Sequence, residues 1–179
     1  MARVLEWPHK MLTRVVEPVP HGEKCRDLIE AMFESMDFPT GIGLAAPQIG
    51  ENKRIIVIKV PALKRGRNVS GATKHVIINP EIFWKKGEME IAPEGCLSFP
   101  GAQVMIPRWP RIKVRGFDIK WNPITIGGKG LIARVLQHEI DHLMGRTLDH
   151  YVRLAANIGQ DVVISNVTEQ LDHDIASKG

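Results

Sequence analysis

Apolar side chains recur with helical spacing in several stretches of the chain. Within residues 22–37 they stand three and four positions apart, which predicts a helix with one buried face. They are Leu28, Ile29, Met32, Phe33 and Met36. The same spacing over residues 131–144 predicts a second helix that stops at Gly145. Its apolar stripe consists of Leu131, Ile132, Val135, Leu136, Ile140 and Leu143. A further helix is expected from Val152 onward, through Leu154, Ile158 and Val162.

Three runs of apolar and β-branched residues predict strands. The clearest covers residues 54–60, and shorter runs cover 75–79 and 112–117. Polar stretches at 64–73 and 121–123 predict exposed loops. Because strands and helices mix without a regular βαβ alternation, we expect an α+β fold. In that fold, mixed or antiparallel strands pack around the helix over residues 131–144.

The composition narrows the class of protein. A chain of 179 residues, 44% hydrophobic and 25% charged, fits a globular domain and excludes fibrous and disordered classes. Residues 1–10 lack the apolar segment of a secretory signal, and no apolar run approaches the roughly 20 residues needed to span a bilayer. We therefore expect a cytoplasmic protein with no membrane partner.

The charge of the chain is moderately basic. Lys and Arg number 24 against 20 Asp and Glu, a net charge of +4, and the basic residues cluster at 53–74 and 108–120. These residues form no nucleic-acid recognition motif, and basic faces are common on soluble enzymes. A solvated surface is the favoured interpretation, with no specific nucleic acid as partner, while a transient contact with the ribosome stays open.

The first candidate for chemistry is the H-E-x-x-H sequence formed by His138, Glu139 and His142. Residues four apart on a helix are separated by about 400°, so both imidazoles can face one metal ion. Glu139 lies about 100° around the helix from His138, where a carboxylate can reach a water without being a ligand. The apolar flanks place these polar groups in a pocket rather than on a surface. The motif therefore predicts a metal site with a base beside it.

Cysteine supplies the candidate for a third ligand. A catalytic metal site usually takes three protein ligands and leaves one position for water. The chain has only Cys25 and Cys96, too few for a disulfide framework. Cys25 lies on an apolar-patterned helix and fits a small buried hydrophobe. Cys96, between Pro93 and Pro100, does not fit that description and is the predicted ligand.

Three segments of the chain resemble the signatures of a known family. Residues 41–48 read Gly-Ile-Gly-Leu-Ala-Ala-Pro-Gln, residues 94–98 read Glu-Gly-Cys-Leu-Ser, and residues 137–143 read Gln-His-Glu-Ile-Asp-His-Leu. In this order they closely resemble the three motifs of peptide deformylase. The resemblance extends more weakly from Val4 to Asp149. It implies a catalytic domain over residues 1–150 and a C-terminal tail, partly helical, over residues 151–179.

The resemblance implies a function and a metal centre. Peptide deformylases hydrolyse the N-formyl group of formyl-methionine on newly made polypeptides and release formate. By this resemblance Cys96, His138 and His142 bind one divalent ion and Glu139 carries the proton. Fe(II) is the ion expected in the cell, and Zn(II), Ni(II) or Co(II) would suit the same ligands. The Gln48 side chain and the Leu97 backbone N–H are expected to stabilise the oxyanion.

The resemblance also implies how a formyl-methionyl peptide is held. The peptide should extend beside Ile42 and Gly43, with Gly95 close by. Gly43 would permit that close approach, although a tight turn explains the glycine equally well. Leu131 and Val135, with Ile42, are expected to line the methionine pocket.

Several residues depart from the family pattern. Gln103 stands where many relatives carry an arginine, and Arg134 occupies a helix position that is often apolar near the methionine pocket. These departures predict altered substrate specificity rather than altered catalysis. The 121–126 stretch and the tail after Asp149 are more similar to divergent or phage-borne forms, so a phage or an organelle stays open as the source.

Two alternative functions are weighed against the deformylase. A zinc peptidase would also use H-E-x-x-H, with His150 as a candidate third ligand, but it leaves residues 94–98 without a role. A basic binding module with a structural metal would need a fourth protein ligand, and none is obvious beside Cys96. Both alternatives therefore explain fewer residues than a deformylase does.

Overall fold

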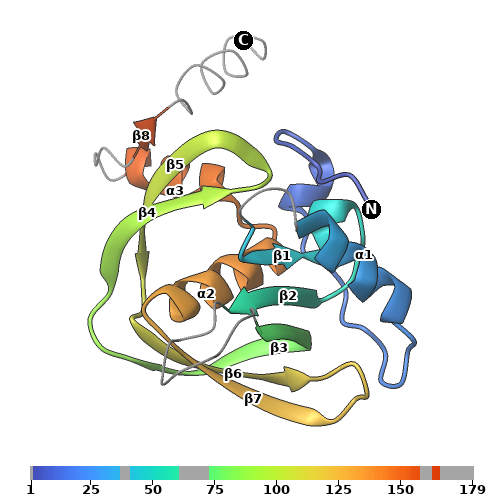
Figure 1. The fold of residues 1–179 in the computed structure, drawn as a ribbon. Helices are drawn as coiled ribbons and strands as arrows, with labels where there is room; N and C mark the ends of the chain where they lie inside the picture. Colours follow the sequence, from blue (N-terminus) through green and yellow to red (C-terminus); the bar gives the residue numbers. More distant parts are fainter. Residues whose placement is uncertain (1, 37–40, 61–72, 158–162, 166–179) are drawn as a thin grey trace, which may run out of the picture.

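The computed structural model describes residues 2–36, 41–60, 73–157 and 163–165 (Figure 1). The helices in these ranges are α1 (Arg26–Met36), α2 (Leu131–Leu143) and α3 (Leu148–Asn157), with 3-10 helices η1 (Lys10–Thr13) and η2 (Ala46–Ile49). The strands are β1 (Gly43–Ala45), β2 (Ile55–Val60), β3 (Thr73–Lys86), β4 (Glu90–Cys96), β5 (Phe99–Arg108), β6 (Arg111–Phe117), β7 (Pro123–Lys129) and β8 (Val163–Ser165). The predicted α+β class is confirmed.

The strands form two antiparallel sheets with α2 between them. Five strands pair in the order β1-β2-β3-β6-β7, and three pair in the order β4-β5-β8. Figure 1 shows α2 crossing the centre of the molecule, with the five-stranded sheet on one side and the β4–β5 hairpin on the other. The expectation of strands packed around this central helix is therefore also confirmed.

The two faces of β2 explain how both helices are held. Ile56 and Ile58 face α2 and belong to a core that includes Leu136 and Leu143 of that helix. Alternate residues of the same strand face the other way, toward Cys25 and the buried residues of α1. This period of two is the pattern of a strand buried on both sides. Cys25 is a core residue, as its helical context predicts.

The predicted end of the central helix is confirmed. Gly145 has a φ of +67°, a conformation that disfavours residues with a Cβ. A Cβ at this position would also collide with the backbone of Thr13. Glycine is therefore required where the chain leaves α2.

The structure differs from the sequence-based expectations in five strands and one helix. The prediction lacked β1, β4, β5, β7 and β8. In β4 the buried side chain is the polar Glu94, so this strand lacks the apolar alternation that identifies others. The last helix begins at Leu148 rather than after Val152, and Ile158 and Val162 lie outside the described residues. Among the residues described, no helix has the length and apolar character required to cross a membrane.

Two neighbouring glycines of β7 give a matched test of how closely this strand packs on α2. A Cβ at Gly128 would lie 2.9 Å from the backbone N and Cα of Ala133, whereas a Cβ at Gly127 would meet nothing within 4 Å. Gly128→Ala should therefore lower the free energy of unfolding by about 1–3 kcal/mol. Gly127→Ala should change it by less than about 0.5 kcal/mol. Urea unfolding followed by tryptophan fluorescence measures both, and equal effects would contradict this packing.

Candidate metal centre

Three metal-ligating side chains converge from two elements. α2 presents His138 and His142 one turn apart, with ring centroids 5.0 Å from each other. Cys96 stands at the end of β4, and its Sγ lies 3.3 Å from Nε2 of His142. The ligand atoms of all three residues lie within 4.8 Å of one another. The structure therefore brings together the three residues predicted as ligands.

The spacing and chemistry of these donors fit a divalent ion. Zn–S and Zn–N bonds of about 2.3 and 2.0 Å in a tetrahedral shell would separate the donor atoms by about 3.5 Å. The 3.3 Å between Cys96 and His142 is close to that value. Burial, reinforced by His138 and Arg108, lowers the pKa of His142, which favours the neutral imidazole that a metal requires. A thiolate with two imidazoles suits soft or borderline ions such as zinc or iron.

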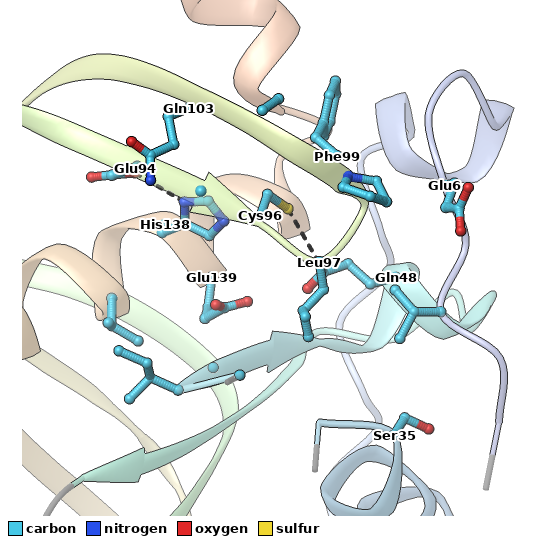
Figure 2. Close-up of a pocket in the computed structure, with 18 of the residues that line it drawn as sticks. Glu6, Ser35, Gln48, Glu94, Cys96, Leu97, Phe99, Gln103, His138 and Glu139 are labelled. Atoms are coloured by element: carbon cyan, nitrogen blue, oxygen red, sulfur yellow. Dashed lines mark hydrogen bonds and ion pairs between the residues drawn. The ribbon is translucent and has the colours of Figure 1, made fainter. Parts of the chain in front are cut away.

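Glu94 orients one of the two histidines. Its Oε2 lies 2.9 Å from Nδ1 of His138, which leaves Nε2 of that ring for the cluster (Figure 2). Arg108 donates two hydrogen bonds of 2.9 Å to the same carboxylate. Burial would raise the pKa of Glu94, but the hydrogen bonds from His138 and Arg108 lower it to about 2. The carboxylate therefore stays charged and accepts the hydrogen bond from His138.

Arg108 joins this carboxylate to the last helix. Its Nη1 donates to Asp141 of α2 and, at 2.9 Å, to the hydroxyl of Tyr151 of α3. The Tyr151 hydroxyl in turn donates to Asp141. The side chains of Arg108 and Glu94 are both 5% exposed, so each charge depends on the other. No role was predicted from the sequence for Glu94, Arg108, Asp141 or Tyr151. Glu94 and Asp141 carried a signal, because each lies inside one of the three family motifs.

Arg134 has a different environment from the one its sequence position suggests. Its Nη1 donates to Oε1 of Glu94 at 2.9 Å and to the Ile106 carbonyl at 2.8 Å, and its Nη2 donates to the Glu90 carbonyl at 2.8 Å. The side chain is 14% exposed. The guanidinium is thus engaged by a carboxylate and two carbonyls. It ties α2 to β4 and β5.

Glu139 lies beside the ligands in a confined space. It is buried, and its Oε2 has no hydrogen-bond partner among the described residues. Burial raises the pKa of Glu139 to about 7. Gly43 of β1 lies directly against this side chain, because a Cβ there would fall 2.8 Å from the Glu139 Cδ and closer still to Oε1. The glycine therefore makes room for the carboxylate.

Gln48 and Leu97 lie on the side of the cluster opposite α2 (Figure 2). The Ala45 backbone N–H donates to the Gln48 Oε1 at 2.8 Å, which fixes the orientation of the amide. The Gln48 Nε2 then points toward Cys96, 3.5 Å from Sγ, and donates to Ser98 Oγ at 3.2 Å. An N–H donor is thereby directed at the cluster.

A cavity of about 1070 Å³ opens over this arrangement. All residues predicted to bind substrate line it: Ile42, Gly43, Gly95, Leu131 and Val135. Cys96, His138 and Glu139 line it too, together with Gln48, Leu97, Gln103 and Arg134. The predicted catalytic and substrate-binding residues therefore share one pocket with Cys96 and His138, two of the three predicted ligands.

Comparison with known proteins agrees with this geometry. The family model described as polypeptide deformylase matches residues 1–157. The chain belongs to the peptide deformylase family. Members of this family remove N-formyl groups from nascent peptides by metal-dependent hydrolysis, and the protein is such a hydrolase. The zinc-peptidase and structural-metal hypotheses are therefore set aside.

Solved deformylases share the fold. The enzyme from Vibrio parahaemolyticus bacteriophage VP16T, in complex with actinonin, is 42% identical with a TM-score of 0.73, over 81% of this chain and 98% of that one. A probable deformylase from Synechococcus phage S-SSM7 is 35% identical with a TM-score of 0.75, over 84% and 99%. The Acinetobacter baumannii deformylase bound to Met-Ala-Ser is 30% identical with a TM-score of 0.74, over 83% and 96%. Two of these three are phage proteins, which fits the phage-like features of the sequence.

The contact between Gly43 and Glu139 can be tested with a methyl group. Gly43→Ala should lower formate release from formyl-Met peptides by about 100-fold, because the buried carboxylate must move by a distance comparable to 1 Å. Bound metal should remain, since none of the three ligands is touched. Gly127→Ala is the control, because its Cβ would meet nothing within 4 Å and the residue does not line the cavity. Comparable activity in the two variants would refute the crowding of Glu139.

A role of Arg134 in supporting Glu94 can be distinguished experimentally from a role in substrate choice. Arg134→Leu removes a partner of Glu94 and should weaken metal binding by about 10–100-fold, the range seen when support of a ligand is lost. Competition with a zinc chelator measures this affinity. Arg134→Lys should recover part of it, and Arg115→Leu, which breaks an exposed pair with Glu81, should leave it unchanged. An altered preference among peptides with unaltered metal affinity would show that Arg134 acts on substrate instead.

Proposed function

We propose that Cys96, His138 and His142 hold the catalytic divalent ion of this deformylase and that Glu139 is its proton carrier. The observation that carries the proposal is the convergence of these three donors beside a buried carboxylate in the large pocket. When bound, the ion supplies a Lewis acid that polarises the formyl oxygen and lowers the pKa of water toward about 7.

Glu139 accepts a proton from the attacking water and later donates it to the amine nitrogen of the leaving peptide. The C–N bond of the formamide breaks, so formate and a free N-terminus are released. The raised pKa of Glu139, about 7, supports this role because the carboxyl group can both take and give a proton near neutral pH. One residue thereby serves both halves of the reaction.

Gln48 and Leu97 are proposed to stabilise the oxyanion formed when water adds to the formyl carbon. The Gln48 Nε2 and the Leu97 backbone N–H would donate to that oxygen. The hydrogen bond from Ala45 to the Gln48 Oε1 supports this assignment, because it keeps the amide N–H group directed at the cluster. A preorganised donor of this kind contributes about 2.7–4 kcal/mol to transition-state stabilisation.

The proposed substrate is a polypeptide that begins with formyl-methionine. Its backbone would extend along Ile42 and Gly43 with Gly95 opposite, and its first side chain would enter the apolar part of the pocket beside Leu131 and Val135. The position of these residues along one cavity supports the proposal. The Acinetobacter baumannii relative bound to Met-Ala-Ser supports it as well.

The proposed working ion is Fe(II), with Zn(II), Ni(II) or Co(II) as substitutes that the same ligands accept. We further propose that the enzyme acts in the cytoplasm and meets its substrates in a transient contact with the ribosome. Residues 1–150 are proposed as the catalytic domain, with residues 151–179 as a C-terminal tail.

The assignment of ligand and base is tested by two substitutions. Glu139→Gln should keep its metal and lose about 10²–10⁴-fold in formate release, because only a proton carrier is removed. Cys96→Ala should lose metal as well as activity. Elemental analysis and a formate assay on formyl-Met peptides measure both quantities. Near-normal turnover in metal-loaded Glu139→Gln, or full metal occupancy in Cys96→Ala, would overturn the assignment.

The identity of the ion is tested by reconstituting the metal-free protein without oxygen. The iron form should release formate fastest at first and then lose activity in air, because Fe(II) and its thiolate ligand are oxidised. The zinc and nickel forms should be more durable. An iron form slower than the zinc form before exposure to air would count against iron as the working ion.

A further inference from the structure

The five-stranded sheet has one region of its outer face that none of the described helices covers. α2 packs on the inner face, against Ile112 and Val114 of β6. α1 packs on the outer face, mainly over β1 and β2, in a core that also includes Ile78 of β3. The alternate residues of β6, Arg111 and Lys113, point away from α2 and are exposed. This part of the sheet therefore presents its side chains directly to solvent.

Strand register places cations side by side on this surface. Lys86 of β3 is the direct partner of Arg111 in β6, and Arg111 is the direct partner of Lys129 in β7. The three cations thus form one row across three strands. The next row pairs Trp84 with Lys113, whose Nζ lies 5.4 Å from the centroid of the indole ring. We call these five residues the cationic face.

The charges of the cationic face are not compensated within the part of the chain that the structure describes. None of its four cations has a carboxylate partner there, unlike the neighbouring Arg115, which pairs with Glu81. Like charges directly opposite on adjacent strands destabilise a sheet. A polyanion that bridges the row would relieve this repulsion.

We propose that the cationic face binds the phosphate backbone of single-stranded RNA without sequence preference. A positively charged surface with an aromatic ring on which a base can stack is the combination that binds single strands. Trp84 is 38% exposed and supplies that ring. A membrane surface is the competing occupant, because Phe83 beside Trp84 is also 45% exposed, and the vesicle measurement below separates it from RNA.

The position of the cationic face suits an enzyme that acts on nascent chains. None of its residues lines the catalytic cavity, so bound RNA leaves the pocket open. Lys129 nevertheless precedes by two residues Leu131, which lines that cavity. The proposal does not depend on the assignment of the metal ligands, because RNA binding and formate release are measured separately. It gives the proposed contact with the ribosome a physical basis.

The test is fluorescence anisotropy of a labelled oligouridine of about 20 nucleotides, longer than the roughly 4–16 nucleotides that one such surface covers. Binding is measured over a range of salt concentrations. The triple variant Lys86→Gln, Arg111→Gln, Lys129→Gln should bind at least tenfold more weakly. Its slope of log affinity against log salt should fall by about 2, since each phosphate contact contributes about 0.7 for single strands.

The matched control removes three other exposed cations, Lys10→Gln, Lys24→Gln and Arg26→Gln, and should keep the slope of the unmodified protein. Formate release from a short formyl-Met peptide should be unchanged in both triple variants. If the first triple variant loses this activity, the single variant Arg111→Gln, with an expected slope change of about 0.7, decides instead. Equal losses of RNA affinity in variant and control would overturn the proposal. Absence of RNA binding, or equally tight binding to phosphatidylserine vesicles with the same dependence on the variants, would overturn it too.

Discussion

The proposed metal centre depends on the buried carboxylate of Glu94, which connects β4 to α2 and β5 through hydrogen bonds. Two proposed ligands lie on α2 and the third lies at the end of β4, so the centre exists only if helix and strand keep one relative position. Glu94 belongs to β4, yet it accepts hydrogen bonds from His138 and Arg134 of α2 and from Arg108 of β5. These three cationic or donor groups surround one buried charge. Removing one of them would leave that charge poorly compensated, which is costly in a protein interior.

The same network gives α3 a place in the support of the site. Tyr151 contacts both Arg108 and Asp141. α3 therefore helps to position Arg108, which in turn holds the carboxylate that orients His138. The family match extends to residue 157, past the end of the three motifs. This bond network is a physical reason for that extent, because α3 contributes to the orientation of α2 without touching the cavity.

The five-stranded sheet divides the molecule into surfaces with different tasks. Its inner face holds α2 through apolar contacts, and its outer face is covered by α1 over one half only. The chemistry is therefore built on the inner side. The uncovered half of the outer side carries charged residues such as Arg111 and Lys113, which are exposed to solvent and make no core contacts.

From the sequence alone we could predict the helix over residues 131–144, the strand over 54–60 and the family, and could name three candidate ligands that the fold brings together. These features follow from local periodicity and from contiguous motifs, which need no knowledge of distant residues. The spacing of His138 and His142, for example, gives their common direction as soon as a helix is assumed. The end of that helix at Gly145 follows in the same way.

The charged residues near the site acquire their roles only in the folded protein. Arg134 stands 40 positions from Glu94 in the chain, so its sequence context shows a lone cation on an apolar helix, whereas the folded protein pairs the two. β4 was not predicted because its buried side chain is the charged Glu94 rather than an apolar residue. A charge is normally assigned to the surface. It becomes part of the interior only when partners from other elements surround it, and that meeting is a property of the fold rather than of any local segment.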